Sequence, residues 1–280
     1  MHAAFNRHRM ERALNKYSIH FAHNNQLTGG DPPRILSKQP GAIIIRRGDF
    51  IEKTGRRVRP CEEAALRRVQ HHTSVPVPTV YSSSFSENNG YICMSYVDGE
   101  PLDSLWDCCE DDEKKALVCR QVWDLIYQLR TIPKPAEFAN YFQCSADGTA
   151  SNDVLIKPLP EQGRDSLASD ADLRQRIYEQ YFCNFGRRYE EELPHMLPRS
   201  ENTVFTHADI APRIILLGDG DDCPVIGIVD WENAGWYPEY WEYANIMKPS
   251  NDEYWQMWME RMAPERWDMS GIVAARRVVF

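Results

Sequence analysis

The chain has 280 residues, of which 42% are hydrophobic and 26% are charged, and its formal net charge is −9. This composition predicts a globular protein with a sizeable core. The acidic balance argues against general nucleic-acid binding, which depends on lysine and arginine, and against adhesion to anionic membranes. No apolar run approaches the roughly 20 residues that span a bilayer, so we expect no membrane segment. The cysteine usage, described next, predicts a cytoplasmic protein.

Two further features of the composition bear on the class of protein. The eight cysteines are scattered without a CxxC pair, and a chain of this length needs no disulfides, so we expect reduced, mostly buried thiols. The first 26 residues lack the apolar core of a secretory signal. Their basic residues faintly resemble a mitochondrial presequence, but we expect a helix that packs on the body of the protein.

The first half of the chain predicts strands. Apolar runs at 41–45 and 50–53 flank a turn near residues 47–49, and runs at about 79–85 and 91–97 flank a second turn at 87–90. Between these pairs, residues 60–71 predict a helix that begins at Pro60 and places Ala65, Leu66 and Val69 on one apolar face.

Residues 98–101, Asp-Gly-Glu-Pro, separate this half from a second half in which helices dominate. Segments 110–131 and 170–190 carry apolar residues at helical spacing, segment 133–165 is a loop-rich insert, and the aromatic tail from Pro238 is helical. We therefore predict an α+β fold with two unequal lobes, a strand-rich lobe over residues 1–98 and a helical lobe over residues 99–280.

The chemistry is concentrated between His207 and Glu232. Asp209 and Asp230 follow two short apolar strands separated by a turn. Phosphoryl transfer needs such a pair, one carboxylate to accept a hydroxyl proton and one to hold a divalent metal against phosphate oxygens. Upstream, Lys53 ends a strand and Glu62 opens the next helix, which is how an ammonium group is aimed at nucleotide phosphates. A single lysine–glutamate pair at this spacing is more often a solvated ion pair on the surface. The order of Lys53, Glu62 and both aspartates along the chain makes this pair informative.

In these segments the chain resembles the aminoglycoside phosphotransferase and choline kinase group, especially its fungal small-molecule phosphotransferases. The resemblance runs from about residue 40 to 248 and rests on the motifs FIEKTG, HTSVPVPTVY, MSYVDGEPL, FTHADIAPRIILL and GIVDWENAGWYPEYWEY. It implies a bilobal protein-kinase-like fold that holds ATP and Mg²⁺ between its lobes and acts on a small-molecule substrate.

The resemblance also implies roles for individual residues. Lys53 would contact the α- and β-phosphates, oriented by Glu62 or, failing that, Glu63. Asp209 would be the catalytic base and Asp230 the metal ligand. The adenine would meet the segment formed by Met94, Ser95 and Val97. The candidate substrate-lining residues are Trp231, Glu232, Trp236 and Tyr237, for which core packing is the alternative.

Two positions depart from the family pattern. Ala208 replaces a common glycine, and Ile214 replaces the asparagine that ligates metal in kinase-type loops. Magnesium prefers about six oxygen ligands, so losing one preorganised group predicts a rate loss on the order of 10²–10³. Asn233, three residues after Asp230, is a weak candidate for a replacement ligand.

The departure at Ile214 leaves three functions open. The first is ATP-dependent phosphoryl transfer to a hydroxyl of a small molecule. The second is a kinase-fold enzyme repurposed for ATP-independent acid/base chemistry, a cyclisation, isomerisation or elimination in a secondary-metabolite pathway, because an apolar pocket raises carboxylate pKa values. The third is an inactive pseudokinase that serves as a binding module. No protein partner is indicated.

Overall fold

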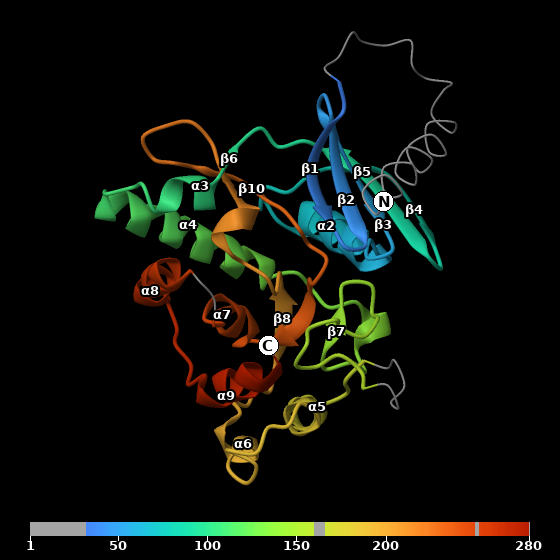
Figure 1. Cartoon of the computed structure of the whole chain (residues 1–280), viewed down its shortest axis with the longest axis vertical. Coiled ribbons are helices and arrows are strands. Elements are labelled where there is room, and N and C mark those ends of the chain that lie inside the picture. The colour runs from blue at the N-terminus through green and yellow to red at the C-terminus, as the bar shows by residue number, and fades with distance from the viewer. Residues whose placement is uncertain (1–31, 160–165, 250–251, 280) are drawn as a thin grey trace, which may run out of the picture.

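The computed structural model describes residues 32–159, 166–249 and 252–279. A strand-rich N-terminal part packs against a larger helical part that carries two small three-stranded sheets (Figure 1). The predicted α+β class is confirmed. The helix expected within the first 26 residues lies outside the described residues. No helix in the described ranges is long and apolar enough to cross a bilayer.

The strand-rich part is an antiparallel sheet with the strand order β1-β2-β3-β5-β4. Its members are β1 (Arg34–Gln39), β2 (Ala42–Arg47), β3 (Phe50–Gly55), β4 (Val80–Ser86) and β5 (Asn89–Ser95). The sequence predicted four of these strands but missed β1. That strand is almost entirely exposed, so it lacks the apolar alternation that marks a half-buried strand.

Helix α2 (Pro60–His72) covers this sheet, as predicted. Pro60 occupies its first turn, where its missing N–H costs nothing, and Ala65, Leu66 and Val69 are fully buried on one face. Cys61 on the same helix donates its thiol to the carbonyl oxygen of Glu232 at 3.4 Å. Helix α2 is therefore fastened to the segment that carries Asp230.

The chain passes from the first sheet to the helical part through residues 96–99. It enters β6 (Glu100–Pro101), which pairs with β9 (Ile215–Leu217), and β9 pairs in turn with β10 (Val225–Ile228). A side chain at Gly99 would place its Cβ 2.9 Å from the Leu217 carbonyl oxygen, so the crossing requires glycine. The hairpin preceding Asp230 is thus joined directly to the connection between the two parts.

Helices and one further small sheet make up the rest of the described chain. The helices are α3 (Leu102–Trp106), α4 (Asp112–Leu129), η1 (Ala136–Phe138), α5 (Asp170–Cys183), α6 (Leu193–Met196), η2 (Pro212–Ile214), α7 (Trp241–Ile246), α8 (Glu253–Met262) and α9 (Ser270–Val279). The sheet has the order β7-β11-β8, from β7 (Cys144–Ser145), β11 (Gly235–Pro238) and β8 (Thr203–Thr206). Its strands are too short to show a period in sequence.

Two sequence predictions, one about this half and one about the whole chain, are wrong in detail. Helix α5 ends at Cys183 and not near residue 190, because Asn184 caps it and Phe185 then adopts a left-handed φ of 63° with 85% of its surface exposed. The cysteines are free, but only Cys61, Cys119 and Cys144 are buried, so the expectation of mostly buried thiols is not met. The remaining cysteines lie on half-buried or exposed positions of several elements.

Candidate active site

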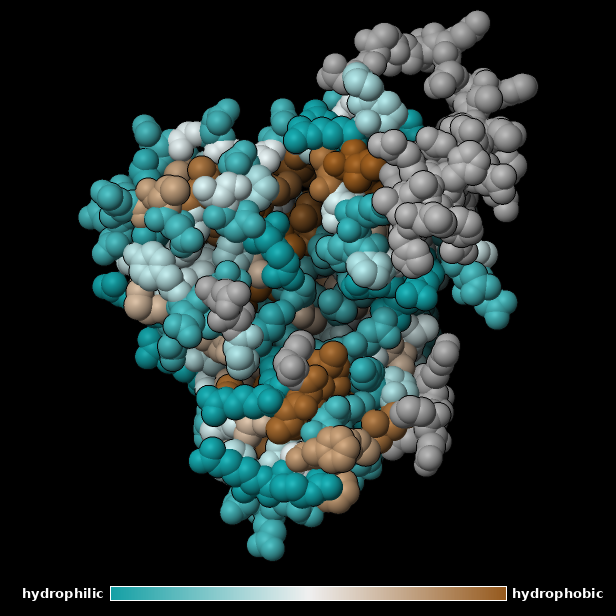
Figure 2. Space-filling model, viewed as in Figure 1, coloured by the Kyte–Doolittle hydropathy of each residue, from teal (hydrophilic) through white to brown (hydrophobic). Residues whose placement is uncertain are grey.

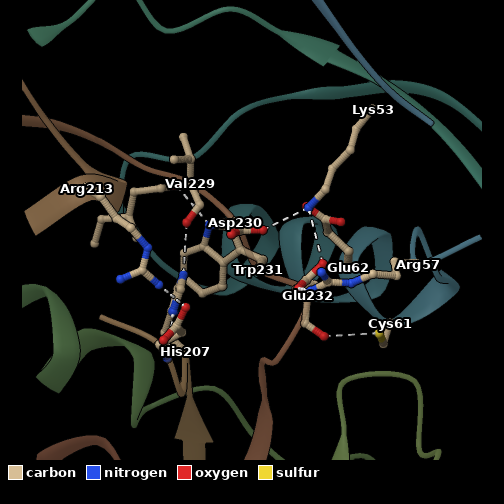
Figure 3. A network of polar contacts seen from close by, with 12 residues as sticks. Lys53, Arg57, Cys61, Glu62, His207, Arg213, Val229, Asp230, Trp231 and Glu232 are labelled. Carbon is tan, nitrogen blue, oxygen red and sulfur yellow. Dashed lines mark hydrogen bonds and ion pairs between the residues drawn. The ribbon is translucent and has the colours of Figure 1, made fainter. Parts of the chain in front are cut away.

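Lys53 is the centre of a charged cluster at the junction of the two parts (Figure 3). Its ammonium group lies 2.8 Å from Glu62 Oε1 on α2, 2.8 Å from Asp230 Oδ1 and 3.6 Å from Glu232 Oε2. The side chain is 5% exposed. Residues separated by up to 179 positions in sequence thus meet at one ammonium group, as the order of motifs predicted.

The charged groups in this cluster shift one another's pKa values. Burial disfavours the Lys53 ammonium, but its three carboxylate neighbours outweigh burial and raise the pKa of Lys53 above its ordinary value. Burial acts to raise the pKa of Asp230, yet the Lys53 ammonium holds that pKa below its ordinary value. Burial raises the pKa of Glu62 despite Lys53. The Glu62 Oε2 atom is buried and has no hydrogen-bond partner among the described residues.

Asp209 lies beside this cluster in a second set of ion pairs. Its Oδ1 accepts from Lys248 Nζ, and its Oδ2 accepts from Arg213. The Arg213 guanidinium also helps to lower the pKa of Asp230, so it acts on both aspartates. The carboxylate of Asp209 is 14% exposed and lines a cavity that Glu232 also lines. Asp230 is not among the residues that line this cavity, so the meeting of both aspartates in one cleft stays a prediction; Arg213 connects them, and they follow strands of different sheets.

His207 joins the two aspartate-bearing loops. The Asp209 backbone N–H donates to His207 Nδ1 at 3.2 Å, so the proton of the neutral ring resides on Nε2, which donates to the Val229 carbonyl oxygen at 3.1 Å. The Trp231 ring packs edge-on against the imidazole at a centroid distance of 4.5 Å. Burial lowers the pKa of His207 to about 4, which keeps the ring neutral and the link intact near neutral pH.

Glu242, the second residue of α7, fixes the backbone before Asp209. Its carboxylate accepts from the backbone N–H groups of His207 at 2.7 Å and Ala208 at 3.2 Å. Glu242 is 2% exposed, and burial raises its pKa to about 7. Sequence reasoning missed this residue because 35 positions separate it from His207 and only the acid within an apolar helix hinted at a buried role.

The opposed pKa shifts of His207 and Glu242 predict a compensated pH dependence. In the folded protein His207 stays neutral down to about pH 4, whereas in the unfolded chain it is protonated below about pH 6.5. The free energy of unfolding therefore falls by about 3 kcal/mol in total as the pH falls from 6.5 to about 4. In the folded protein Glu242 stays protonated up to about pH 7, whereas in the unfolded chain it is ionised above about pH 4.5. The free energy of unfolding therefore falls by about 3 kcal/mol as the pH rises from 4.5 to about 7. The two contributions nearly cancel between these limits.

Variants that lack one of these two groups are expected to show the pH dependence of stability that the other group causes. Urea unfolding of His207→Asn at several pH values should show stability rising as the pH falls from 7 to 4.5, relative to the wild type. Glu242→Gln should show the reverse trend from 6.5 to 4. Comparing slopes removes any pH-independent cost of either substitution. Parallel curves for both variants and the wild type would show that neither group changes its proton binding on folding.

Two residues of the site have strained backbones. Ala208 has φ = 67° and Asp230 has φ = 66°, both in the left-handed region that non-glycine residues rarely occupy. For Ala208 this conformation costs about 1–2 kcal/mol, a cost that glycine would not carry. Such strain persists where the surrounding contacts determine the backbone, and here Glu242 and Lys53 supply those contacts.

Ile214 ends the 3₁₀ turn η2 immediately before β9, and the strand begins one residue later than the apolar run in the sequence suggested. Its carbonyl oxygen accepts from the Val229 N–H at 3.0 Å, so its backbone lies next to the Asp230 loop. The side chain is 3% exposed and belongs to the hydrophobic core. At this position the protein offers metal neither oxygen nor nitrogen from a side chain.

The segment predicted to meet adenine lies at the end of β5. Met94 is buried, and Ser95 is tied to Thr79 both by its backbone N–H, which donates to the Thr79 carbonyl, and by its hydroxyl, which accepts from the Thr79 N–H. Val97 follows in the connecting segment. Figure 2 shows the surface hollowed between the strand-rich part and the helical part, with apolar surface in the hollow. The adenine assignment stays a prediction.

Three of the four predicted substrate-lining residues are core residues. Trp231, Trp236 and Tyr237 are at most 1% exposed. The Trp231 N–H donates to the Ile228 carbonyl, Trp236 packs edge-on against Phe205, and the Tyr237 hydroxyl donates to the Asn233 carbonyl. None of the three lines the cavity beside Asp209, whereas Glu232 and Asn233 do. Glu232 is bound to Arg57 at 2.8 Å.

A family match gives this geometry its context. Residues 47–268 match the phosphotransferase enzyme family, a span that includes every residue of the charged cluster. The chain belongs to the phosphotransferase enzyme family. The predicted resemblance is confirmed in this respect. No curated protein sequence matches the chain.

Solved structures that resemble the chain are aminoglycoside phosphotransferases. One is APH(2'')-Ib with bound ADP, with 12% identity, a TM-score of 0.59, and coverage of 92% of this chain and 84% of that chain. Another is APH(3'')-Id from Streptomyces rimosus, with 17% identity, a TM-score of 0.53, and coverage of 95% and 98%. A third is an aminoglycoside-3'-phosphotransferase of type VIII, with 18% identity, a TM-score of 0.54, and coverage of 92% of this chain and 97% of that chain. At these identities the similarity establishes the kinase-like fold.

Proposed function

We propose that this protein is an ATP-dependent phosphotransferase that transfers the terminal phosphoryl group to a hydroxyl of a small molecule. The observation that carries the proposal is the buried Lys53 ammonium, held between Glu62 and Asp230 at 2.8 Å from each. A family member whose solved structure contains ADP has the same fold. We also propose that the two lobes are residues 1–98 and 99–280, because the connection between the first sheet and the helical part lies at this boundary.

On the nucleotide side, Lys53 holds phosphate oxygens and Glu62 fixes the direction of its ammonium group. Met94, Ser95 and Val97 form the proposed adenine-binding edge. On the acceptor side, Asp209 accepts the hydroxyl proton while the hydroxyl oxygen bonds to the terminal phosphorus. The bond from that phosphorus to its bridging oxygen breaks, and ADP is the other product. The Arg213 and Lys248 side chains hold the Asp209 carboxylate in place.

The residues present fit a divalent metal only in part. Asp230 offers a carboxylate whose side chain is 37% exposed, and Glu232 lies near the same ammonium group, but Ile214 contributes no ligand. Asp230, with Glu232 as its nearest carboxylate neighbour on the loop, would hold Mg²⁺. The metal supplies charge neutralisation at the phosphate oxygens. An incomplete protein shell predicts weak metal affinity and slow turnover.

Restoring the missing ligand tests the proposal. Ile214→Asn is expected to raise Mg²⁺-dependent ATP turnover, measured as ADP release, by about 10- to 10³-fold. The same change should lower the free energy of unfolding by about 2 kcal/mol, because it places an amide in an apolar cluster. Ile214→Val is the matched control, since it shortens the side chain without adding a ligand. Thermal shifts of both variants and the wild type, with ATP, Mg²⁺ and the two together, complete the test.

The proposal fails if neither the wild type nor Ile214→Asn binds ATP with Mg²⁺. That outcome would favour the second candidate, ATP-independent acid/base chemistry. The observation that favours this second candidate is Ile214, an apolar, buried residue whose backbone is hydrogen-bonded to Val229, next to Asp230 in the chain. It predicts binding of an apolar ligand that EDTA does not weaken and turnover that disappears in Asp209→Asn without any requirement for nucleotide.

A further inference from the structure

The cavity beside Asp209 is cationic in an otherwise acidic protein. It has a volume of about 460 Å³, and five positively charged side chains line it, from Arg56, Arg57, Arg59, Lys248 and Arg276. Only three acidic side chains line it, those of Asp153, Asp209 and Glu232. The net charge of the whole chain is −9, so this excess of positive charge is a local property of the cavity.

The acids of the cavity are already engaged. Glu232 binds Arg57 and lies near Lys53, and Asp209 binds Lys248 and Arg213. The Asp153 carboxylate accepts from the Leu155 N–H at 2.9 Å. Within the described ranges, no ion pair joins Arg56, Arg59 or Arg276 to a carboxylate. Three guanidinium groups in the wall therefore have no carboxylate partner within the described ranges, and an anion could bind them.

Arg276 is the most informative of the three because it is buried. It lies on α9, is 2% exposed, and donates to the Ala244 carbonyl and, at 2.6 Å, to Asn245 Oδ1 on α7. Asp153 and Asp209 act on it electrostatically, but neither forms an ion pair with it. A buried cation that forms no ion pair is costly, so its retention at a cavity wall favours an anion that completes the site.

Asn245 adds a donor of its own. Because a guanidinium group only donates, the contact with Arg276 fixes the Asn245 oxygen toward Arg276 and leaves the Nδ2 group facing elsewhere. This Nδ2 is buried and has no hydrogen-bond partner among the described residues, although Asn245 lines the cavity and is 3% exposed. Arg276 and Asn245 thus present donors, which suit an acceptor group such as a carboxylate and repel an ammonium group.

We propose, on the basis of the phosphotransferase function above, that the acceptor is a hydroxy acid whose acid group binds at Arg276, Asn245 and Arg59 while its hydroxyl meets Asp209. The same chemistry has a second source, since nucleotide phosphates are also anions. Lys53 already serves the phosphates, whereas Arg276 and Asn245 lie on α9 and α7 of the helical part, beside the proposed base. Polyamine acceptors, including amino sugars, are disfavoured.

Matched phenols test this assignment without nucleotide. The dissociation constants of 4-hydroxybenzoate, neutral 4-hydroxybenzamide and cationic 4-(aminomethyl)phenol are measured by calorimetry at constant chloride concentration. The wild type should bind the carboxylate at least about tenfold more tightly than the amide. This preference should shrink severalfold in Arg276→Lys and in Arg59→Gln, and it should persist in the control Arg67→Gln, which removes a surface arginine of α2 outside the cavity.

Repeating the titration with Mg²⁺ and a saturating non-hydrolysable ATP analogue separates the two anion sources. Retained carboxylate binding supports an acceptor site, whereas displacement assigns the cavity to nucleotide phosphates and overturns the inference. Equal affinity for carboxylate and amide, or no binding of the carboxylate, also overturns it. Arg59→Gln keeps the test decisive if Arg276→Lys does not fold. Because the first titration needs no nucleotide, its outcome is independent of whether phosphoryl transfer occurs.

Discussion

Replacement of Lys53 by methionine is expected to lower the free energy of unfolding by about 3–5 kcal/mol at pH 7 and to abolish stabilisation by ATP with Mg²⁺. The reason is electrostatic. Lys53 neutralises Glu62, which is 2% exposed, and also faces Asp230 and Glu232. Removing the ammonium leaves a buried carboxylate without a counter-ion and two more carboxylates close by. Urea unfolding and thermal shift with nucleotide measure the two effects.

The origin of this loss is checked by changing Glu62 as well. The double variant Lys53→Met with Glu62→Leu should regain most of the stability, because it removes both members of the buried pair, but should not regain nucleotide binding. In the single variant the loss should be smaller at pH 5 than at pH 8, since protonation of Glu62 relieves the buried charge. Lys114→Met on α4 is the control. A single variant as stable as the wild type would contradict the geometry of the cluster.

Replacement of Asp209 by asparagine is expected to lower the rate of phosphoryl transfer by about 10²–10⁴-fold while leaving the affinity for ATP within about threefold. An asparagine retains the shape of the side chain but accepts no proton. In the proposed site the nucleotide phosphates meet Lys53 and the metal that Asp230 would hold, not Asp209, so nucleotide binding should survive. The rate is measured as ADP release, either with a hydroxy acid as the acceptor or, in its absence, from the slow transfer to water.

Asp230→Asn gives the contrasting result, because this residue is the proposed metal ligand and a partner of Lys53. It should weaken Mg²⁺-dependent ATP binding as well as turnover. Asp103→Asn on the exposed side of α3 controls for the loss of one negative charge. Turnover of Asp209→Asn close to that of the wild type would remove Asp209 from the role of base and would leave its two cationic neighbours as structural ion pairs.

Elements whose pattern repeats locally could be predicted from the sequence. The period of apolar residues gave α2, α4 and the start of α5, and alternation with turn residues gave β2 to β5. Strands β7 and β11 were not predicted, because two to four residues carry no period and their pairing joins segments up to 92 positions apart. The exposed β1 was missed for the same physical reason, since it carries no buried face.

The candidate site divides in a similar way. The amino-acid sequence alone determined the phosphotransferase motifs, and with them Lys53, Glu62, Asp209 and Asp230, because their chemistry depends on residue type and order. It also determined the loss of the loop asparagine. Only the tertiary structure decided that Trp231, Trp236 and Tyr237 pack inside the core. The cationic cavity was likewise decided in three dimensions, because the positive charge of the cavity that Asp209 lines comes from Arg59, Lys248 and Arg276, which are far apart in sequence and meet only in the folded chain.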